Sequence, residues 1–390
     1  MTVPTPPPLA AGSSAPPCTV YDVALLDLDG VVYVGPDAVP GVPEALRDAR
    51  AAGMRMGFVT NNAARTPEQV AEHLTELGVP AEPGDVITSS QAAASVVAAL
   101  LEPGAPVLAV GGPGVAAALT AAGLTVVERA EDRPAAVVQG YGRDVGWLQL
   151  AEVVVAVREG AHHVATNIDA TIPSPRGPLP GNGAMVGVVR DVTGQEPLVT
   201  GKPDPAMHAE CVRRTGARRP LVVGDRLDTD IEGARRAGAA SLLVFSGVTD
   251  PAVLIAAGPQ HRPDLLADDA GGLLRPHPAV TTDGASWRCG NWTVRAAEGE
   301  GVLVLDGGSD AADSDAADGD GLDGLRALCV AHWSRHPEHG APVRVVAAGP
   351  RAGDALGRWG LAAGPSADQG CRPLRAACAD GAGRAAPPPA

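Results

Sequence analysis

The sequence has 390 residues, enough for two or three domains with a sizeable buried core. Its formal net charge of -15 argues against a general binder of nucleic acid or of anionic membranes. No apolar run reaches the length of about 18 residues that a membrane-spanning helix needs, so no membrane partner is expected.

The first 19 residues are rich in Pro, Ala and Ser and contain no basic segment followed by an apolar core. They predict a disordered tail over residues 1–19 and no signal peptide. The six cysteines are scattered and form no C-x-x-C pair. This pattern favours reduced thiols in a cytoplasmic protein over a zinc site or a disulfide framework.

The first apolar run, residues 23–26, predicts a buried strand of a parallel sheet. It is followed by Asp27, Asp29 and Gly30, two carboxylates and a residue that lets the backbone turn. Ligands of open α/β sheets bind beyond the carboxyl ends of the strands, which makes this pair a candidate site. Asp and Gly also simply end strands, so taken alone the stretch leaves both interpretations open.

A second strand is predicted over residues 56–59, after a helix over residues 43–52. Strand, helix and strand form a βαβ unit whose crossover is right-handed, so the two strand ends lie side by side. Thr60 and Asn61, which follow the second strand, are therefore expected beside Asp27 and Asp29.

The sequence continues with alternating strands and helices to about residue 192. Gly111 to Gly114 resemble a dinucleotide-binding turn, but Ala117 replaces the third glycine, which favours a plain turn between strand and helix. Asn167 and Asp169 follow another strand and begin a long loop. They either bind substrate hydroxyls or order their own loop. The strands expected here cover residues 106–110, 135–139 and 162–165, and the helices cover residues 66–77, 90–101, 114–122 and 146–158.

Lys202 is the only lysine in the chain, whereas all other basic side chains except histidine are arginine. A lone lysine marks a position where a compact charge is needed and a planar guanidinium does not fit. It precedes a predicted helix and a third apolar strand, residues 221–223, which ends in Gly224, Asp225 and Asp230. Another strand is expected over residues 241–245.

These groups suit the cleavage of a phosphate ester. A carboxylate that attacks a phosphate is repelled by it, and Mg²⁺ held by Asp27 and Asp225 removes that obstacle. Asp29 is placed to protonate the leaving oxygen and then to deprotonate water. Thr60 and Asn61 offer hydrogen bonds to phosphate oxygens, and Lys202 offsets the negative charge.

Taken together, the motifs resemble those of the haloacid dehalogenase (HAD) superfamily, in the branch of NagD-type and p-nitrophenyl-phosphatase-like enzymes. The resemblance covers about residues 20 to 275 and implies a Rossmann-like α/β core with an inserted α/β cap. The core would comprise residues 20–64 and 196–275, and the cap residues 65–195. The matching segments are Asp27-Leu28-Asp29-Gly30, Val59-Thr60-Asn61-Asn62-Ala63, Ala165-Thr166-Asn167, Pro180-Gly181-Asn182-Gly183, Gly201-Lys202-Pro203 and Gly224-Asp225-Arg226-Leu227-Asp228-Thr229-Asp230-Ile231.

The resemblance also implies roles for individual residues. Asp27 would be the nucleophile that forms an aspartyl-phosphate, and Asp29 would be the acid/base, with its backbone carbonyl on Mg²⁺. Asp225 would bind the metal and Asp230 would support the metal site. Since transport ATPases of the superfamily have Thr in place of the second acid, Asp29 favours a hydrolase.

The composition changes after about residue 276, and a small α/β domain is predicted over residues 280–365. It resembles the degenerate acetyltransferase-like (GNAT) domain fused to a subgroup of glycerol-3-phosphate phosphatases, but has no Gly-rich pyrophosphate loop, so acetyl transfer is not expected. The acidic run from residue 306 to 323 fails the EF-hand template and predicts a solvated flexible loop. Residues 366–390 predict a second disordered tail.

The sequence therefore predicts a Mg²⁺-dependent phosphomonoesterase that acts on a small phosphorylated metabolite. The cap offers only Tyr141 and Trp147 as aromatic surfaces, which favours a polyol phosphate such as glycerol 3-phosphate. Phosphoglycolate, nucleoside monophosphates and pyridoxal phosphate are alternative substrates. Other hypotheses are a phosphotransferase that uses the same aspartates and a regulatory protein in which the last domain matters most. A homodimer is a further possibility, because caps of this family often pair.

Overall fold

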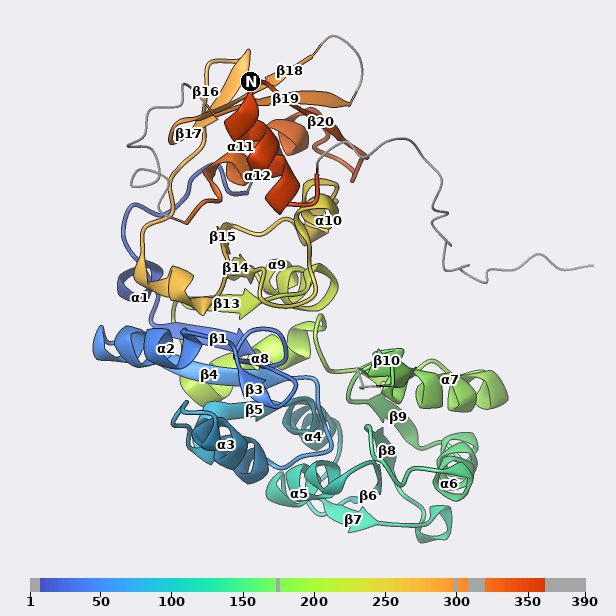
Figure 1. Cartoon of the computed structure of the whole chain (residues 1–390). Helices are drawn as coiled ribbons and strands as arrows, with labels where there is room; N and C mark the ends of the chain where they lie inside the picture. Colours follow the sequence, from blue (N-terminus) through green and yellow to red (C-terminus); the bar gives the residue numbers. More distant parts are fainter. Residues whose placement is uncertain (1–7, 173–175, 298–300, 308–319, 362–390) are drawn as a thin grey trace, which may run out of the picture.

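The computed structural model describes residues 8–172, 176–297, 301–307 and 320–361. They form a core, a cap and a C-terminal α/β domain, as Figure 1 shows. The core is a six-stranded parallel sheet in the order β15-β14-β13-β1-β4-β5. Among the described helices, none has the length and apolar character required to cross a membrane. The core strands are β1 (Val23–Asp27), β4 (Arg55–Thr60), β5 (Val86–Thr88), β13 (Pro220–Gly224), β14 (Ala240–Val244) and β15 (Leu265–Ala267).

The register of the sheet brings the expected site residues to one edge. Asp27 of β1 is paired with Val59 of β4, the residue before Thr60. On its other side β1 pairs with β13, Leu26 with Val223. Because all three strands run parallel, their carboxyl ends lie together, as the sequence predicted.

Helices cover both faces of the core sheet because the residues of β1 alternate. Ala24 and Leu26 pack into one apolar cluster with α2 and α3, whereas Val23 and Leu25 pack on the other face with α8. The helices of the core are α1 (Pro17–Val20), α2 (Val42–Ala51), α3 (Pro67–Glu76), α4 (Ser89–Leu100), α8 (Pro205–Thr215), α9 (Glu232–Arg236) and α10 (Pro251–Ile255). A short β2–β3 hairpin (Tyr33–Val34 and Asp37–Ala38) follows β1.

The cap boundaries expected at residues 65 and 195 are both wrong. β5 completes the core sheet, so α3 and β5 belong to the core, and β12 pairs with β9 in the cap sheet. A strand of three residues has too little periodicity to be recognised from sequence, although Val86 and Ile87 are fully buried. The cap elements are β6 (Pro106–Val110), α5 (Pro113–Ala121), β7 (Thr125–Val127), β8 (Ala136–Gln139), α6 (Trp147–Arg158), β9 (His162–Ala165), β10 (Thr171–Ile172), β11 (Leu179–Pro180), α7 (Asn182–Thr193) and β12 (Leu198–Val199).

The glycine-rich segment between β6 and α5 is a plain turn, as predicted. The loop between β4 and α3 packs against this turn, and Gly114 N–H donates to the Ala64 carbonyl of that loop at 3.1 Å. A Cβ atom on Gly112 would lie 2.6 Å from Ala64 Cα, and one on Gly114 would lie 2.4 Å from the Arg65 oxygen. The glycines are therefore explained by the close approach of the chain itself.

The C-terminal domain packs directly on the core. One apolar cluster joins Leu243 and Leu266 of the core to Leu325 and Leu328 of α11, and Trp333 Nε1 donates to the Ile255 carbonyl at 3.0 Å. Three antiparallel pairings and one parallel pairing form its sheet, β16-β17-β18-β19-β20. Its elements are β16 (Thr281–Thr282), β17 (Ser286–Cys289), β18 (Trp292–Ala296), β19 (Val302–Asp306), α11 (Asp323–Arg335), β20 (Arg344–Ala347) and α12 (Pro350–Arg358).

The disordered tail expected over residues 1–19 is wrong for residues 8–19. Leu9 is only 3% exposed and belongs to the cluster shared with the C-terminal domain. Ser13 exchanges backbone hydrogen bonds with His277, and Val280 N–H donates to the Ala10 carbonyl at 3.0 Å. These partners are more than 250 residues away, so composition alone could not reveal them. Residues 1–7 and the tail expected over 366–390 lie outside the described residues.

The acidic run from residue 306 to 323 is not solvated at its end. The side chains of Asp320 and Asp323 are 9% and 6% exposed, and both form ion pairs with the buried Arg326. A buried guanidinium neutralises them, which the local sequence could not show. Residues 308–319 of the run lie outside the described residues.

Candidate active site

Three carboxylates that follow two neighbouring strands form a compact cluster. Asp27, Asp225 and Asp230 each place an oxygen within 4.8 Å of the others. Asp225 is fully buried: its Oδ2 accepts the Val248 N–H at 2.7 Å, whereas its Oδ1 has no hydrogen-bond partner. Burial and the charge of Asp27 raise the pKa of Asp225 to about 6.

This cluster fits a divalent cation. Mg²⁺ and Ca²⁺ bind carboxylate oxygens, and the unpartnered Oδ1 of Asp225 is a buried acceptor of that kind. Burial first, and then the charge of Asp27, disfavours the ionised form of Asp225, and a cation beside its carboxylate would offset both effects. The structure thus brings together Asp27 and Asp225, the two residues that the sequence proposed as metal ligands.

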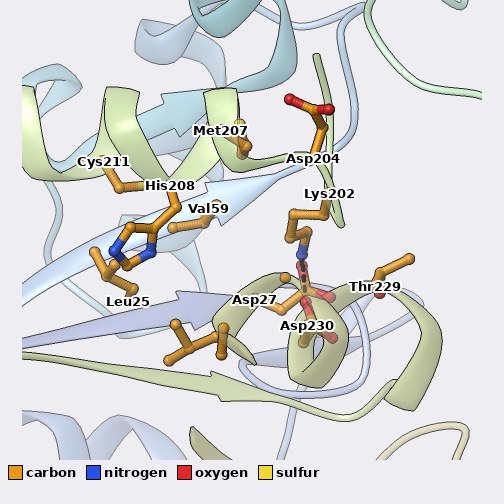
Figure 2. Close-up of a pocket in the computed structure, with 13 residues that line it drawn as sticks. Leu25, Asp27, Val59, Lys202, Asp204, Met207, His208, Cys211, Thr229 and Asp230 are labelled. Carbon is orange, nitrogen blue, oxygen red and sulfur yellow. Dashed lines mark hydrogen bonds and ion pairs between the residues drawn. The ribbon is translucent and has the colours of Figure 1, made fainter. Parts of the chain in front are cut away.

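Lys202 points directly at this cluster. Its Nζ lies 2.8 Å from Asp27 Oδ1 and 2.7 Å from Asp230 Oδ1, as Figure 2 shows. Burial opposes the charge of Lys202, but Asp230 and Asp27 outweigh it and hold the pKa of the ammonium above its usual range. The lysine therefore remains charged beside the nucleophile candidate.

Asp230 lies behind Lys202 and Asp27 and is 1% exposed. Its Oδ1 binds the Lys202 ammonium, and its Oδ2 accepts the Arg226 N–H at 3.2 Å. A single π-helical turn, Leu227–Ile231, carries it back toward the strand end. Burial raises the pKa of Asp230 to about 7, with Lys202 acting against the rise. Both oxygens are engaged, so Asp230 serves the site mainly by holding the lysine.

Asp29 faces solvent at the opening of the site. Partial enclosure and the charge of Asp27 raise its pKa above the ordinary value. A raised pKa keeps a carboxyl protonated at higher pH, which suits a proton donor. Thr60 is buried at the end of β4, and its Oγ1 accepts the Asn62 N–H at 3.0 Å. The Thr60 hydroxyl can still donate to an anion.

The side-chain amide of Asn61 binds the backbone of Lys202. Its Oδ1 accepts the Lys202 N–H at 2.8 Å and its Nδ2 donates to the Lys202 carbonyl at 3.1 Å. The side chain that the sequence assigned to phosphate binding is therefore engaged by the protein backbone.

The cap residues Asn167 and Asp169 order the loop after β9. Asn167 is 4% exposed; its Nδ2 donates to the Asn61 carbonyl at 2.8 Å and its Oδ1 accepts the Asp169 N–H at 3.1 Å. For Asn167 the geometry supports the second of the two alternatives, since neither side-chain polar atom is free for a substrate. Asp169 Oδ2 accepts from Asn61 Nδ2 at 3.3 Å, and burial raises the pKa of Asp169.

Two further residues of this network had no role in the sequence analysis. Ser89 Oγ donates to the Asn61 carbonyl at 2.7 Å, and Asn182 Nδ2 donates to the Asn167 carbonyl at 2.8 Å. Asn182 lies in a Pro-Gly-Asn-Gly segment that already matched the family, a signal that pointed to it without giving its role. Ser89 begins α4 directly after the unrecognised β5, and no local signal identified it.

A small cavity lies on the α8 side of the sheet, behind the carboxylates. Figure 2 shows Met207, His208 and Cys211 of α8 facing Leu25 and Val59 across it. Its volume of ≈ 30 Å³ leaves room for about two water molecules. It is therefore too small to hold a substrate.

Comparison with known proteins identifies the family of this chain. Family models match as haloacid dehalogenase-like hydrolase over residues 24–125, HAD-hydrolase-like over 199–273 and GCN5-related N-acetyltransferase-like domain over 289–361. D-glycerol 3-phosphate phosphatase of Mycobacterium tuberculosis is 43% identical over 343 residues, which cover 87% of this chain and 94% of that protein. Acid sugar phosphatase of Staphylococcus aureus is 38% identical over 231 residues, which cover 59% of this chain and 88% of that protein.

Solved structures give the same result. The crystal structure of glycerol phosphate phosphatase from M. tuberculosis in complex with magnesium is 42% identical, with a TM-score of 0.78, and covers 89% of this chain and 99% of that one. The same phosphatase in complex with calcium is 41% identical, with a TM-score of 0.80, and covers 90% and 99%. The chain therefore belongs to the haloacid dehalogenase superfamily, as a phosphatase with a GNAT-like C-terminal domain.

Proposed function

We propose that this enzyme hydrolyses glycerol 3-phosphate through an aspartyl-phosphate on Asp27. The observation that carries the proposal is the position of Lys202, whose ammonium lies 2.8 Å from Asp27 Oδ1 next to the unpartnered Oδ1 of Asp225. A charged nucleophile, a fixed cation and a buried acceptor for a metal together suit attack on a phosphate dianion. The name of the M. tuberculosis relative supports glycerol 3-phosphate as the substrate.

The reaction has two steps on these residues. An oxygen of Asp27 attacks phosphorus, the ester P–O bond breaks, and the protonated carboxyl of Asp29 gives its proton to the leaving alkoxide. The Asp29 carboxylate then takes a proton from water, whose oxygen attacks phosphorus and breaks the bond to Asp27. Lys202 offsets the charge of Asp27 and of the phosphoryl group, and Thr60 donates to a phosphoryl oxygen.

The cofactor in this proposal is Mg²⁺, held by Asp27 and Asp225 with Asp230 in support. When bound, it neutralises phosphate charge and lowers the barrier to attack by a carboxylate. The Asp29 backbone carbonyl is a further ligand implied by the family resemblance. The magnesium complex of the M. tuberculosis phosphatase supports this choice of metal.

Substrate size follows from the cap. Of its two aromatic side chains, Trp147 is 78% exposed on α6, so it offers no enclosed surface on which a base or a pyridoxal ring could stack. This supports a small polyol phosphate over nucleoside monophosphates and pyridoxal phosphate. A phosphotransferase would use the same residues and differ only in the acceptor.

The remaining proposals concern the cellular location of the enzyme, its oligomeric state and the role of its C-terminal domain. Cys18, Cys211 and Cys329 are buried thiols without a disulfide, which supports a cytoplasmic location. Trp147 and Leu148 of α6 and Val188 and Val192 of α7 are exposed, which supports pairing of two caps in a homodimer. The C-terminal domain shares an apolar cluster with the core, which supports a structural role without acetyl transfer.

The test is a phosphate-release screen over glycerol 3-phosphate, phosphoglycolate, nucleoside monophosphates and pyridoxal phosphate, with and without Mg²⁺. The highest kcat/KM is expected for glycerol 3-phosphate with Mg²⁺. Asp27→Asn should lower turnover by at least about 1,000-fold, because the nucleophile is lost. Wild-type turnover by this variant would exclude the mechanism. An added alcohol that receives the phosphate in place of water would indicate a phosphotransferase.

A further inference from the structure

The amide of Asn61 binds the peptide groups on both sides of the Lys202 side chain. Its Oδ1 accepts the Lys202 N–H at 2.8 Å, and its Nδ2 donates to the Lys202 carbonyl at 3.1 Å, across 141 residues of sequence. These bonds fix the backbone from which the lysine side chain extends. The place of the ammonium between Asp27 and Asp230 therefore depends on the orientation of the Asn61 amide.

The same amide also contacts the cap. Nδ2 of Asn61 donates to Asp169 Oδ2 at 3.3 Å, so this group is shared between the cap loop and the backbone of Lys202. The main chain of Asn61 is held as well, because its carbonyl accepts from Asn167 Nδ2 at 2.8 Å. The cap loop thus binds Asn61 through both its side chain and its backbone.

Gly201, which has no side chain, lets the backbone before Lys202 pack closely against Asn61 and the cap loop. It connects the cap to Lys202, and a Cβ atom there would lie 2.3 Å from the Thr166 oxygen and 2.8 Å from Asn61 Oδ1. The loop after β9, Asn61 and the linker to Lys202 are therefore packed against one another without free space. A displacement of the loop must displace the Asn61 amide or break its bonds.

We propose that Asn61 is a positioning residue that couples the cap to the catalytic lysine. With Asp169 in hydrogen-bond contact, the amide is held in the orientation that places Lys202 against Asp27. With the cap loop displaced, the amide loses that restraint and the lysine loses its alignment. The inference rests on the proposed function, in which Lys202 offsets the charge of Asp27 and the phosphoryl group.

An isosteric exchange of the two side chains tests the coupling. Asn61→Asp keeps the acceptor for the Lys202 N–H but replaces the donor with an oxygen that faces the Lys202 carbonyl and Asp169. Asp169→Asn removes the cap's charge and keeps an oxygen that can accept from Asn61. The double variant restores a donor and acceptor pair between the two positions, with the net charge of the wild type. A purely structural role of Asn61 predicts no such rescue.

The readout is kcat and KM for glycerol 3-phosphate in the presence of Mg²⁺. N61D should lower kcat by about 100-fold with KM changed by less than about threefold, because the lysine is displaced by a fraction of an ångström or more. D169N should lower kcat by less than about fivefold. The double variant should recover kcat about tenfold over N61D.

Asn62→Asp is the matched control, because it adds the same charge one residue along the chain. Asn62 is exposed, and its Oδ1 accepts the Ala64 N–H at 2.9 Å, a bond that aspartate can also make. Its kcat should stay within about threefold of the wild type. Full activity of N61D, a loss confined to KM, or a double variant no faster than N61D would each overturn the coupling.

Two further measurements distinguish a folding defect, or a failure of the proposed function, from a failure of the coupling. If thermal melting shows that N61D does not fold, Asp169→Ala is tested in its place. The proposal then requires that kcat falls by about fivefold while Tm stays the same. An unchanged kcat would overturn it. Wild-type turnover by D27N would instead refute the nucleophile and hence the proposed function, whatever the result for Asn61.

Discussion

Two regions of this enzyme bury a cation between two carboxylates, and they use it differently. In the active site Lys202 lies between Asp27 and Asp230. At the junction of the core and the C-terminal domain, Arg326 lies between Asp320 and Asp323.

At the junction, the cation has a hydrogen-bond partner beyond its two carboxylates. Arg326 also donates to the Leu266 carbonyl of β15 at 2.7 Å, so its planar guanidinium joins α11 to the core in a fixed direction. Only its Nε has no hydrogen-bond partner. In the active site, the neighbouring Asp225 keeps an oxygen unpartnered, and the cation is a compact ammonium. The comparison indicates that a planar cation with several fixed hydrogen-bond partners serves stability, whereas a compact charge beside an unpartnered acceptor serves chemistry.

The largest effect is expected at the junction. Arg326→Met removes the cation that neutralises the buried carboxylates of Asp320 and Asp323, so the free energy of unfolding should fall by about 3–5 kcal/mol. The kcat of the folded protein should change little, since Arg326 binds Asp320, Asp323 and the Leu266 carbonyl rather than the carboxylates of the active site. Denaturant unfolding and steady-state turnover of one preparation measure both quantities. A large loss of kcat at unchanged stability would reverse the assignment.

The reciprocal substitution in the active site is expected to act on turnover. In Lys202→Arg a planar guanidinium replaces an ammonium that sits 2.8 Å and 2.7 Å from two carboxylate oxygens. The larger group displaces Asp27, and kcat should fall by about 100-fold. Stopped-time phosphate assays check this, with the melting temperature as a control for folding. Near-normal turnover would show that charge alone suffices at this position.

A smaller effect is expected where the cap joins the lysine. In Gly201→Ala the added methyl group meets the Thr166 carbonyl and Asn61 Oδ1, so the linker must shift. We expect kcat to fall by about tenfold, because the backbone of Lys202 moves with the linker. Gly194→Ala is a control in the same cap, since a Cβ there meets no atom within 4 Å, although its positive φ of 70° adds some strain. Equal turnover losses in both variants would contradict a specific role for Gly201.

The smallest effect concerns a buried group without any countercharge. Burial lowers the pKa of His163 from 6.5 to about 4, so the folded state holds it neutral. The unfolded state takes up a proton first as the pH falls below 6.5, so the contribution to stability is full above 6.5 and lost toward 4. Between pH 7 and 5.5 the loss is about 1 kcal/mol. His163→Asn has no imidazole to protonate, so its stability does not fall in this way. The difference in unfolding free energy between the variant and the wild type should therefore become smaller as the pH falls. A constant difference would show that His163 is not buried neutral.

The sequence predicted the features that lie at strand ends. Asp27, Thr60 and Asp225 each end or follow an apolar strand, and parallel pairing brings such strand ends together. Lys202 was identified as the only lysine of the chain. The features that it missed depend on contacts between distant segments. Neither the three-residue strand β5, nor the packing of Leu9, nor the ion pairs of Arg326 has a local pattern that distinguishes it from a surface loop.

The role of Asn61 shows the same limit within the site. Its position next to Thr60 indicated proximity to a phosphate, and the structure does place it beside Lys202. Which atoms its amide binds depends on how closely the backbone of residues 201 and 202 approaches, and that distance is a property of the assembled core and cap.

The attachment of residues 8–13 to the C-terminal domain has a consequence for biosynthesis. These residues leave the ribosome before the core and the cap, but their partners His277 and Val280 emerge only after both have been made. Leu9 therefore stays exposed until the C-terminal domain that covers it has been synthesised. A segment translated before the core is then among the last to dock on it.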